Sequence, residues 1–234
     1  MGVKKNGTFF ISTVKRENLV ASIWDPYFYR RNSLKKKLED YADVLKLLSG
    51  KKQSESLPFE PIEYRHIPKG DYLTFVIEPK HKDARVKWPF VGEQQLLFGT
   101  MRAYVGNVLV TPKAEWLGLS APLSFPVKSE FLEIVPKDNC LYFWWAYSRS
   151  SAFLKNLPLG GGGTRPRLHR ESLLSTAVKV PDAERRQSID RELKECAEHE
   201  WREYVRKAEI LRSMNLTENT NARHCARRNR SAKR

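Results

Sequence analysis

The sequence has few of the residues and motifs that most extracellular, membrane or catalytic proteins need. Its three cysteines, Cys140, Cys196 and Cys225, are widely spaced and form no C-x-x-C pair, so neither a disulfide framework nor a zinc site is indicated. It shows no apolar N-terminal signal segment and no run of about 20 apolar residues, the length that a membrane span requires. These absences predict a protein of the reducing cytoplasm that has no membrane partner.

Sequence motifs of known catalytic sites are also missing. The five histidines lie in dissimilar contexts, and none belongs to an H-E-x-x-H motif or lies beside a nucleophile motif. No Rossmann-type glycine motif for a methyl donor is present. Glu60, Glu63, Asp71 and Glu78 could ligate a metal, but their spacing matches no nuclease motif and a solvated acidic face is the simpler interpretation. The sequence therefore predicts a protein that is not an enzyme and needs no metal or other cofactor.

A large excess of positive charge points to a polyanionic partner. The chain has 42 Lys and Arg against 27 Asp and Glu, which gives a formal net charge of +15. Residues 215–234 contribute +5 of this, which leaves +10 on the rest of the chain. The alternative is a generic basic protein that its charge keeps soluble. Nucleic acid is the leading class of partner.

The pattern of apolar and turn-forming residues predicts an α+β protein. Short β-like runs predict a small, curved, mostly antiparallel β-structure with packed helices. These runs lie at residues 72–78, 95–99, 104–111 and 123–127. Apolar residues spaced by three and four predict an amphipathic helix at 33–48, and an aromatic-rich helix is predicted at 141–157. The aromatic stripe of that second helix is more typical of a core than of a stacking platform.

From residue 182 to 214 the chain contains no glycine or proline, which predicts one helix of about 45 Å. Its apolar residues recur at intervals of three and four. This near-heptad pattern favours a coiled-coil-type contact with another long helix, and a helix lying on its own domain is the alternative. The predicted helix interface consists of Ile189, Leu193, Ala197, Trp201, Tyr204, Ala208 and Leu211. We therefore divide the chain into a domain at 1–181, a helix at 182–214 and a basic tail at 215–234 that we expect to be disordered.

A run of four glycines at 160–163 is the most unusual local feature. It leads into Thr164, Arg165, Pro166 and Arg167. Four glycines are costly to order, so a bare backbone is expected to matter there, and no G-K-[ST] pattern supports a nucleotide cradle. Arginine suits bidentate contacts with guanine and contacts with phosphate, which favours a loop that approaches DNA. A purely structural glycine turn is the alternative.

Two further segments carry candidate DNA contacts. Arg102 and Tyr104 lie in a polar interlude between two apolar β-like runs, where recognition residues usually occur, although a solvated turn would look the same. Residues 80–87 are basic at nearly every other position and end at Lys87, which suits contacts with phosphates. A strand edge kept soluble by lysine is the alternative for that segment.

The order of these features resembles the specificity subunits of type I restriction–modification systems. The resemblance spans roughly residues 9–211. The matching pieces are residues 25–29 (DPYFY), 96–104 (LLFGTMRAY), 120–136 (SAPLSFPVKSEFLEIVP), the aromatic helix, the glycine loop with Arg165 and Arg167, 177–181 (AVKVP) and 186–189 (RQSI) at the start of the long helix.

This resemblance implies a target-recognition domain that reads half of a split DNA site, and a helix that acts as spacer and docking rod for modification subunits. The usual family member carries two such domains and two such helices, whereas this sequence shows one of each and no internal repeat. It thus looks like a half-subunit, expected to form a homodimer through its helix and to bind a palindromic split site. The expected partners are double-stranded DNA, an adenine methyltransferase subunit and, as an option, a restriction subunit. The alternatives are a small metal-dependent nuclease and an adaptor or inhibitor that grips a protein.

Overall fold

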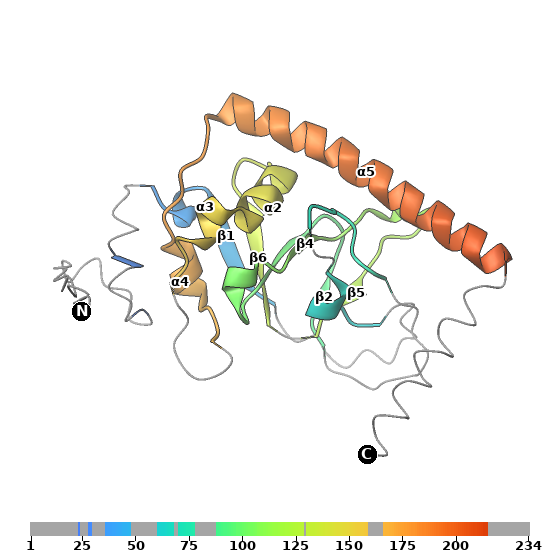
Figure 1. The fold of residues 1–234 in the computed structure, drawn as a ribbon, viewed down its shortest axis with the longest axis horizontal. Coiled ribbons are helices and arrows are strands. Elements are labelled where there is room, and N and C mark those ends of the chain that lie inside the picture. Colours follow the sequence, from blue (N-terminus) through green and yellow to red (C-terminus); the bar gives the residue numbers. More distant parts are fainter. Residues whose placement is uncertain are drawn as a thin grey trace, which may run out of the picture.

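The computed structural model describes residues 23, 28–29, 36–47, 60–67, 70–77, 88–128, 130–158 and 166–214. Its strands are β1 (Ala42–Lys46), β2 (Phe90–Val91), β3 (Leu96–Gly99), β4 (Val108–Val110), β5 (Phe125–Pro126) and β6 (Phe131–Pro136). The central sheet has four antiparallel strands in the order β1-β6-β3-β4. β2 and β5 form a separate antiparallel pair (Figure 1).

Helices pack against this sheet and beside it, and the longest of them runs along the top of the molecule in the view of Figure 1. They are α2 (Leu141–Arg149), α3 (Ser151–Leu154), α4 (Arg170–Leu174) and α5 (Ala183–Ser213), with one-turn 3-10 helices η2 (Leu38–Asp40), η3 (Tyr64–His66), η4 (Ala103–Val105) and η5 (Ala114–Leu117). Mixed helices and antiparallel sheets agree with the predicted α+β class. α5 confirms the predicted long C-terminal helix, which begins after Asp182, whose side chain accepts a hydrogen bond from the backbone N–H of Arg185 at 2.8 Å.

No helix among the described residues is both long enough and apolar enough to cross a lipid bilayer.

β3 is the centre of the core because it pairs with β6 on one side and β4 on the other. Its residues Leu96, Leu97 and Phe98 are fully buried, so both faces of this strand are covered. The aromatic side chains of α2 complete the core, as the sequence predicts. Tyr142, Phe143, Trp144 and Trp145 are all buried. They therefore serve packing and are not available as a stacking platform.

The predicted helix at 33–48 is wrong. Within the described residues 36–47 the chain forms η2 and then β1, which pairs with β6 over its whole length. The buried residues of β1 are Ala42 and Val44. Leu45, which belongs to the stripe predicted to be buried, is 46% exposed. The leucine spacing imitated a helical stripe, and pairing with β6 overrode it.

Several other predicted elements are present with altered bounds. The strand predicted at 95–99 is β3, and the helix predicted at 141–157 breaks at Ser150 into α2 and α3. Ser150 ends one helix and caps the next, because its side-chain oxygen accepts a hydrogen bond from the backbone N–H of Phe153 at 3.2 Å. The strand predicted at 104–111 is shortened to β4 by η4, and the described part of the strand predicted at 72–78, residues 72–77, forms no strand.

α5 packs against the chain's own domain. Most of the apolar face predicted to contact another long helix is therefore occupied by this domain. Ala197 and Trp201 are each only 1% exposed, and the ring of Trp201 lies 5.2 Å from that of Phe75. Ile189, Leu193 and Tyr204 pack against the same core. α5 packs on α2, on η5 and on the segment around Phe75, so it covers the apolar side chains of these elements. Only the last two predicted positions, Ala208 and Leu211, are absent from this core cluster, and both are partly exposed.

Candidate functional site

Two segments that the sequence analysis singled out separately lie side by side. Met101 forms an antiparallel bridge with Arg167. Backbone hydrogen bonds flank the bridge, from the N–H of Arg102 to the carbonyl of Pro166 at 3.0 Å and from the N–H of Leu168 to the carbonyl of Thr100 at 3.0 Å. The Arg102 segment and the C-terminal end of the glycine loop therefore form one surface. Lys87, Thr164 and Arg165 lie outside the described residues.

Arg102 begins a tight turn that exposes apolar side chains. Its backbone is left-handed, with φ 51° and ψ 49°, and Gly106 at the other end of η4 is left-handed as well, with φ 72°. Between them Ala103 is buried, whereas Tyr104 is 57% exposed and Val105 is 54% exposed. A left-handed conformation at a residue other than glycine is uncommon and is often associated with functional sites. The turn fixes Tyr104 and Val105 on the outside of the molecule.

Glu130 connects this turn to the rest of the fold. Its carbonyl oxygen accepts hydrogen bonds from the backbone N–H of Thr100 at 2.7 Å, from the Thr100 hydroxyl at 2.8 Å and from the hydroxyl of Tyr64 at 2.5 Å. Its carboxylate pairs with the guanidinium of Arg167. Glu130 itself has a left-handed backbone, with φ 75°. One residue thus holds the backbone of one segment and the side chain of the other.

Gly99 and Tyr64 form the tightest contact beneath the turn. A Cβ atom on Gly99 would lie 2.7 Å from Cε1 of Tyr64 and 2.9 Å from the carbonyl oxygen of Asn107. The Tyr64 hydroxyl also accepts a hydrogen bond from the backbone N–H of Met101 at 3.2 Å, and burial raises the pKa of this phenol. Only glycine fits at position 99, so Tyr64 can approach the turn this closely only because residue 99 has no side chain.

Beside Arg167 the surface is hollowed and basic. The hollow has a volume of about 450 Å³ and is lined by Lys46, Thr100, Glu130, Phe131, Leu132, Arg167, Leu168, His169 and Arg170. Arg170 is held by a hydrogen bond from its Nε to the carbonyl of Val44 in β1. We call the surface formed by Lys46, Arg102, Arg167, His169 and Arg170, with Tyr104 and Val105 at its edge, the basic surface.

Two members of the acidic set, Glu60 and Glu63, have basic partners. Glu60 lies 3.2 Å from Nη2 of Arg65, and Glu63 lies 3.5 Å from Nε of Arg65 and 2.8 Å from Nζ of Lys128. Among the described residues, no group of three or more His, Cys, Asp or Glu side chains is placed to hold a metal ion. Glu78 lies outside the described residues. The carboxylates at 60 and 63 therefore take part in surface ion pairs.

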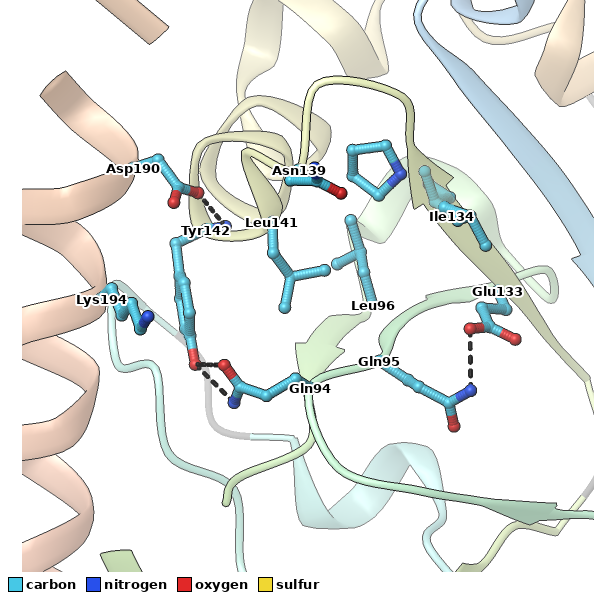
Figure 2. A pocket seen from close by; sticks show the side chains of 12 residues that line it. Gln94, Gln95, Leu96, Glu133, Ile134, Asn139, Leu141, Tyr142, Asp190 and Lys194 are labelled. Atoms are coloured by element: carbon cyan, nitrogen blue, oxygen red, sulfur yellow. Dashed lines mark hydrogen bonds between the residues drawn. The ribbon is translucent and has the colours of Figure 1, made fainter. Parts of the chain in front are cut away.

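A second hollow, of about 280 Å³, lies between the sheet and α5 (Figure 2). Two pairs of its polar side chains are hydrogen-bonded to each other. Gln94 donates to the hydroxyl of Tyr142 at 2.9 Å, and Gln95 donates to the carboxylate of Glu133 at 2.8 Å. Burial raises the pKa of Glu133, and it also raises the pKa of Asp190 on the facing helix. The Gln94–Tyr142 pair joins the start of β3 to α2, and the Gln95–Glu133 pair joins it to β6.

The structure thus brings together three of the predicted DNA-contact residues, Arg102, Tyr104 and Arg167, and adds Lys46, Glu130 and Arg170, which the sequence analysis missed. Lys46 was hidden by the helix predicted at 33–48. The short apolar run of Phe131–Pro136, which includes the β-branched Ile134 and Val135, could have indicated a strand, and so a defined position for Glu130 just before it. The basic surface therefore presents exposed cationic side chains beside an apolar edge that is fixed in position.

Comparison with known proteins adds no relative to this description. No family model matches the sequence, and no curated protein is significantly similar to it.

Proposed function

We propose that this chain is a sequence-specific, double-stranded DNA-binding subunit of a restriction–modification system, which reads a half-site and recruits an adenine methyltransferase. The observation that carries the proposal is the pairing of Met101 with Arg167, which unites the two predicted reading segments on one basic surface. The proposed DNA contacts are Lys87, Arg102, Tyr104, Thr164, Arg165 and Arg167.

The charge and the geometry of the surface support this proposal in different ways. A net charge of +15 favours phosphate binding of any sequence, because neutralising phosphates releases counterions. Reading a sequence needs side chains held in fixed directions. The ion pair between Arg167 and Glu130, and the left-handed turn at Arg102, supply such fixed directions.

In the proposed assembly, the end of α5 meets a second copy of the chain. Ala208 and Leu211 remain partly exposed there, Ile210 is 50% exposed and Met214 is 59% exposed. A homodimer built on this end would place two basic surfaces in twofold symmetry, and its target would then be palindromic and split. The methyltransferase, and optionally a restriction subunit, would dock on the helix, and catalysis would belong to them.

The experiment is a selection of random duplex DNA by the full chain, followed by sequencing of the retained duplexes and by binding measurements at several salt concentrations. We expect one short motif to be enriched and affinity to fall as salt rises. Arg102→Ala and Arg167→Ala should each cost about 1–3 kcal/mol on the selected duplex and relax the motif. Arg191→Ala, an exposed arginine on α5, is the matched control and should bind as the wild type does.

Other outcomes separate the alternatives. If Arg102→Ala and Arg167→Ala lose the same binding affinity on all DNA sequences, the two arginines contact phosphates and not bases. Absence of both enrichment and salt dependence would favour an adaptor or inhibitor of a protein. Cleavage of plasmid by the purified chain with Mg²⁺ would contradict a non-catalytic role and favour the nuclease.

A further inference from the structure

At the exposed edge of the basic surface, the side chain of Val105 and the ring of Tyr104 have no group that binds phosphate, although the Tyr104 hydroxyl could donate to one. Tyr104 is 57% exposed and Val105 is 54% exposed, and only the buried Ala103 separates them from Arg102 in the chain. We call these two residues the η4 ridge. Cations alone would suffice to attract a polyanion, so two large apolar side chains held out beside them indicate a ligand with an apolar group at the same place.

The η4 ridge is fixed in position. The backbone N–H of Val105 donates to the carbonyl of Arg102 at 2.9 Å, and that of Gly106 donates to the carbonyl of Ala103 at 3.0 Å. Beneath the turn, Ala103 is buried, and a Cβ atom on Gly106 would lie 3.1 Å from the side chain of Leu154 in α3. The turn is thus seated on α3, and its outer side chains cannot turn inward to join the core.

The chemistry of DNA supplies one apolar group that fits a ridge flanked by arginines. In the major groove, thymine alone of the four bases presents a methyl group, next to the acceptor atoms of neighbouring bases that arginine binds. The β-branched Val105 is compact and stiff at χ1, and this suits contact with a single methyl group. Charge complementarity between the basic surface and DNA favours this partner over an apolar protein surface.

We infer that the η4 ridge contacts the C5-methyl group of thymine in the major groove while Arg102 and Arg167 bind the bases or phosphates beside it. This inference rests on the proposed function, and it names a base that the half-site must contain. Val105 is then a specificity-determining residue, and its contribution depends on one methyl group of the DNA.

The test replaces thymidine in duplex DNA by deoxyuridine, whose base pairs identically but lacks the methyl group. The full chain is used to select from a duplex library that contains thymidine. The dissociation constant is then measured for the selected duplex and for versions with deoxyuridine at each thymine in turn. The proteins compared are the wild type, Val105→Ala and Val135→Ala. Val135 is an exposed valine near the opposite end of β6 from Phe131, and it serves as the matched control. Thermal unfolding of all three verifies folding.

For the wild type we expect deoxyuridine to weaken binding about three- to fivefold at one or two positions, the effect of removing one buried methyl group. Val105→Ala should weaken binding to the thymine duplex by a similar factor and should no longer distinguish thymine from deoxyuridine at those positions. Val135→Ala should behave as the wild type does. This non-additivity between a side chain and a methyl group identifies direct contact.

Three results would overturn the inference while leaving the proposed function intact. They are a selected motif without thymine, a wild type insensitive to deoxyuridine at every position, and a Val105→Ala variant that retains the wild-type discrimination. A library from which the full chain enriches nothing would overturn both the inference and the proposed function. If the η4 ridge instead binds a protein, Val105→Ala will bind the selected duplex as tightly as the wild type, which also overturns the inference.

Discussion

Asp190 of α5 accepts a hydrogen bond from the backbone N–H of Tyr142 at 2.6 Å, and it accepts another from the N–H of Phe143 at 3.1 Å. The first turn of α2 is therefore capped from another helix. Cys140, which occupies the usual capping position, makes no side-chain hydrogen bond to the helix. The contact ties the start of α2 to α5 (Figure 2).

Replacing Asp190 should distinguish its capping role from its charge. Asp190→Ala should lower the free energy of unfolding by about 1–2 kcal/mol, because two N–H groups lose their acceptor. Asp190→Asn should lose less, since its amide oxygen can still accept. Urea denaturation of both variants measures this difference, and equal losses would show that the cap depends on the charge.

The same residue predicts a pH dependence. Burial raises the pKa of Asp190 in the folded chain, so the folded state binds this proton more tightly than the unfolded state does. Its contribution to stability should therefore fall as pH rises through the acid range, starting near the ordinary Asp pKa of about 3.9. Asp190→Asn should remove that part of the dependence. Urea midpoints of wild type and variant across this range provide the measurement, and parallel curves would contradict the assignment.

Two positions of α5 should respond differently to truncation. Trp201→Ala should destabilise the chain by about 3–5 kcal/mol, because the indole is buried beside Phe75. Leu211→Ala should leave unfolding nearly unchanged and weaken self-association, measured by sedimentation. An intact dimer in the Leu211 variant would remove the end of α5 from the proposed interface.

Gly99 tests how closely the turn at Arg102 depends on Tyr64. Gly99→Ala places a methyl group against the Tyr64 ring and the carbonyl of Asn107, so a loss of about 1–3 kcal/mol in stability is expected. The double variant with Tyr64→Ala should recover part of the loss from Gly99→Ala, because one of the two clashes disappears. Additive losses in thermal unfolding would argue that Tyr64 does not cause the strain.

Glu130→Gln should separate affinity from specificity. The change removes a negative charge from the basic surface, so binding to random duplex DNA should strengthen a few-fold and become more salt-dependent. Arg167 loses the negative charge of the partner that orients it, so it is held less firmly and the preference for the selected motif should shrink. Anisotropy titrations on random and selected duplexes measure both effects. An unchanged preference would mean that Glu130 does not position Arg167 for reading.

Local signals in the sequence sufficed for α5, β3 and the aromatic core of α2, because a long run without glycine or proline, or a dense apolar run, has few alternative structures. They failed at 33–48, where pairing with β6 decided the structure. The bridge between Met101 and Arg167 was also beyond local reasoning, since contacts between distant segments leave no periodic trace. Arg102 and Arg167 were nevertheless selected as candidate DNA contacts, because they lie beside glycine and polar residues.

The position of α5 also divides one helix into parts that open on different time scales. Up to Tyr204 its backbone amides lie over the core, so their hydrogen exchange should require unfolding of the whole domain. From Ala208 onward the turns of α5 do not pack against the core, so their backbone amides should exchange when the helix end frays. A second chain bound to that end would slow its exchange selectively. The last turns of the helix would then report assembly directly, and the rest of α5 would report the integrity of the domain.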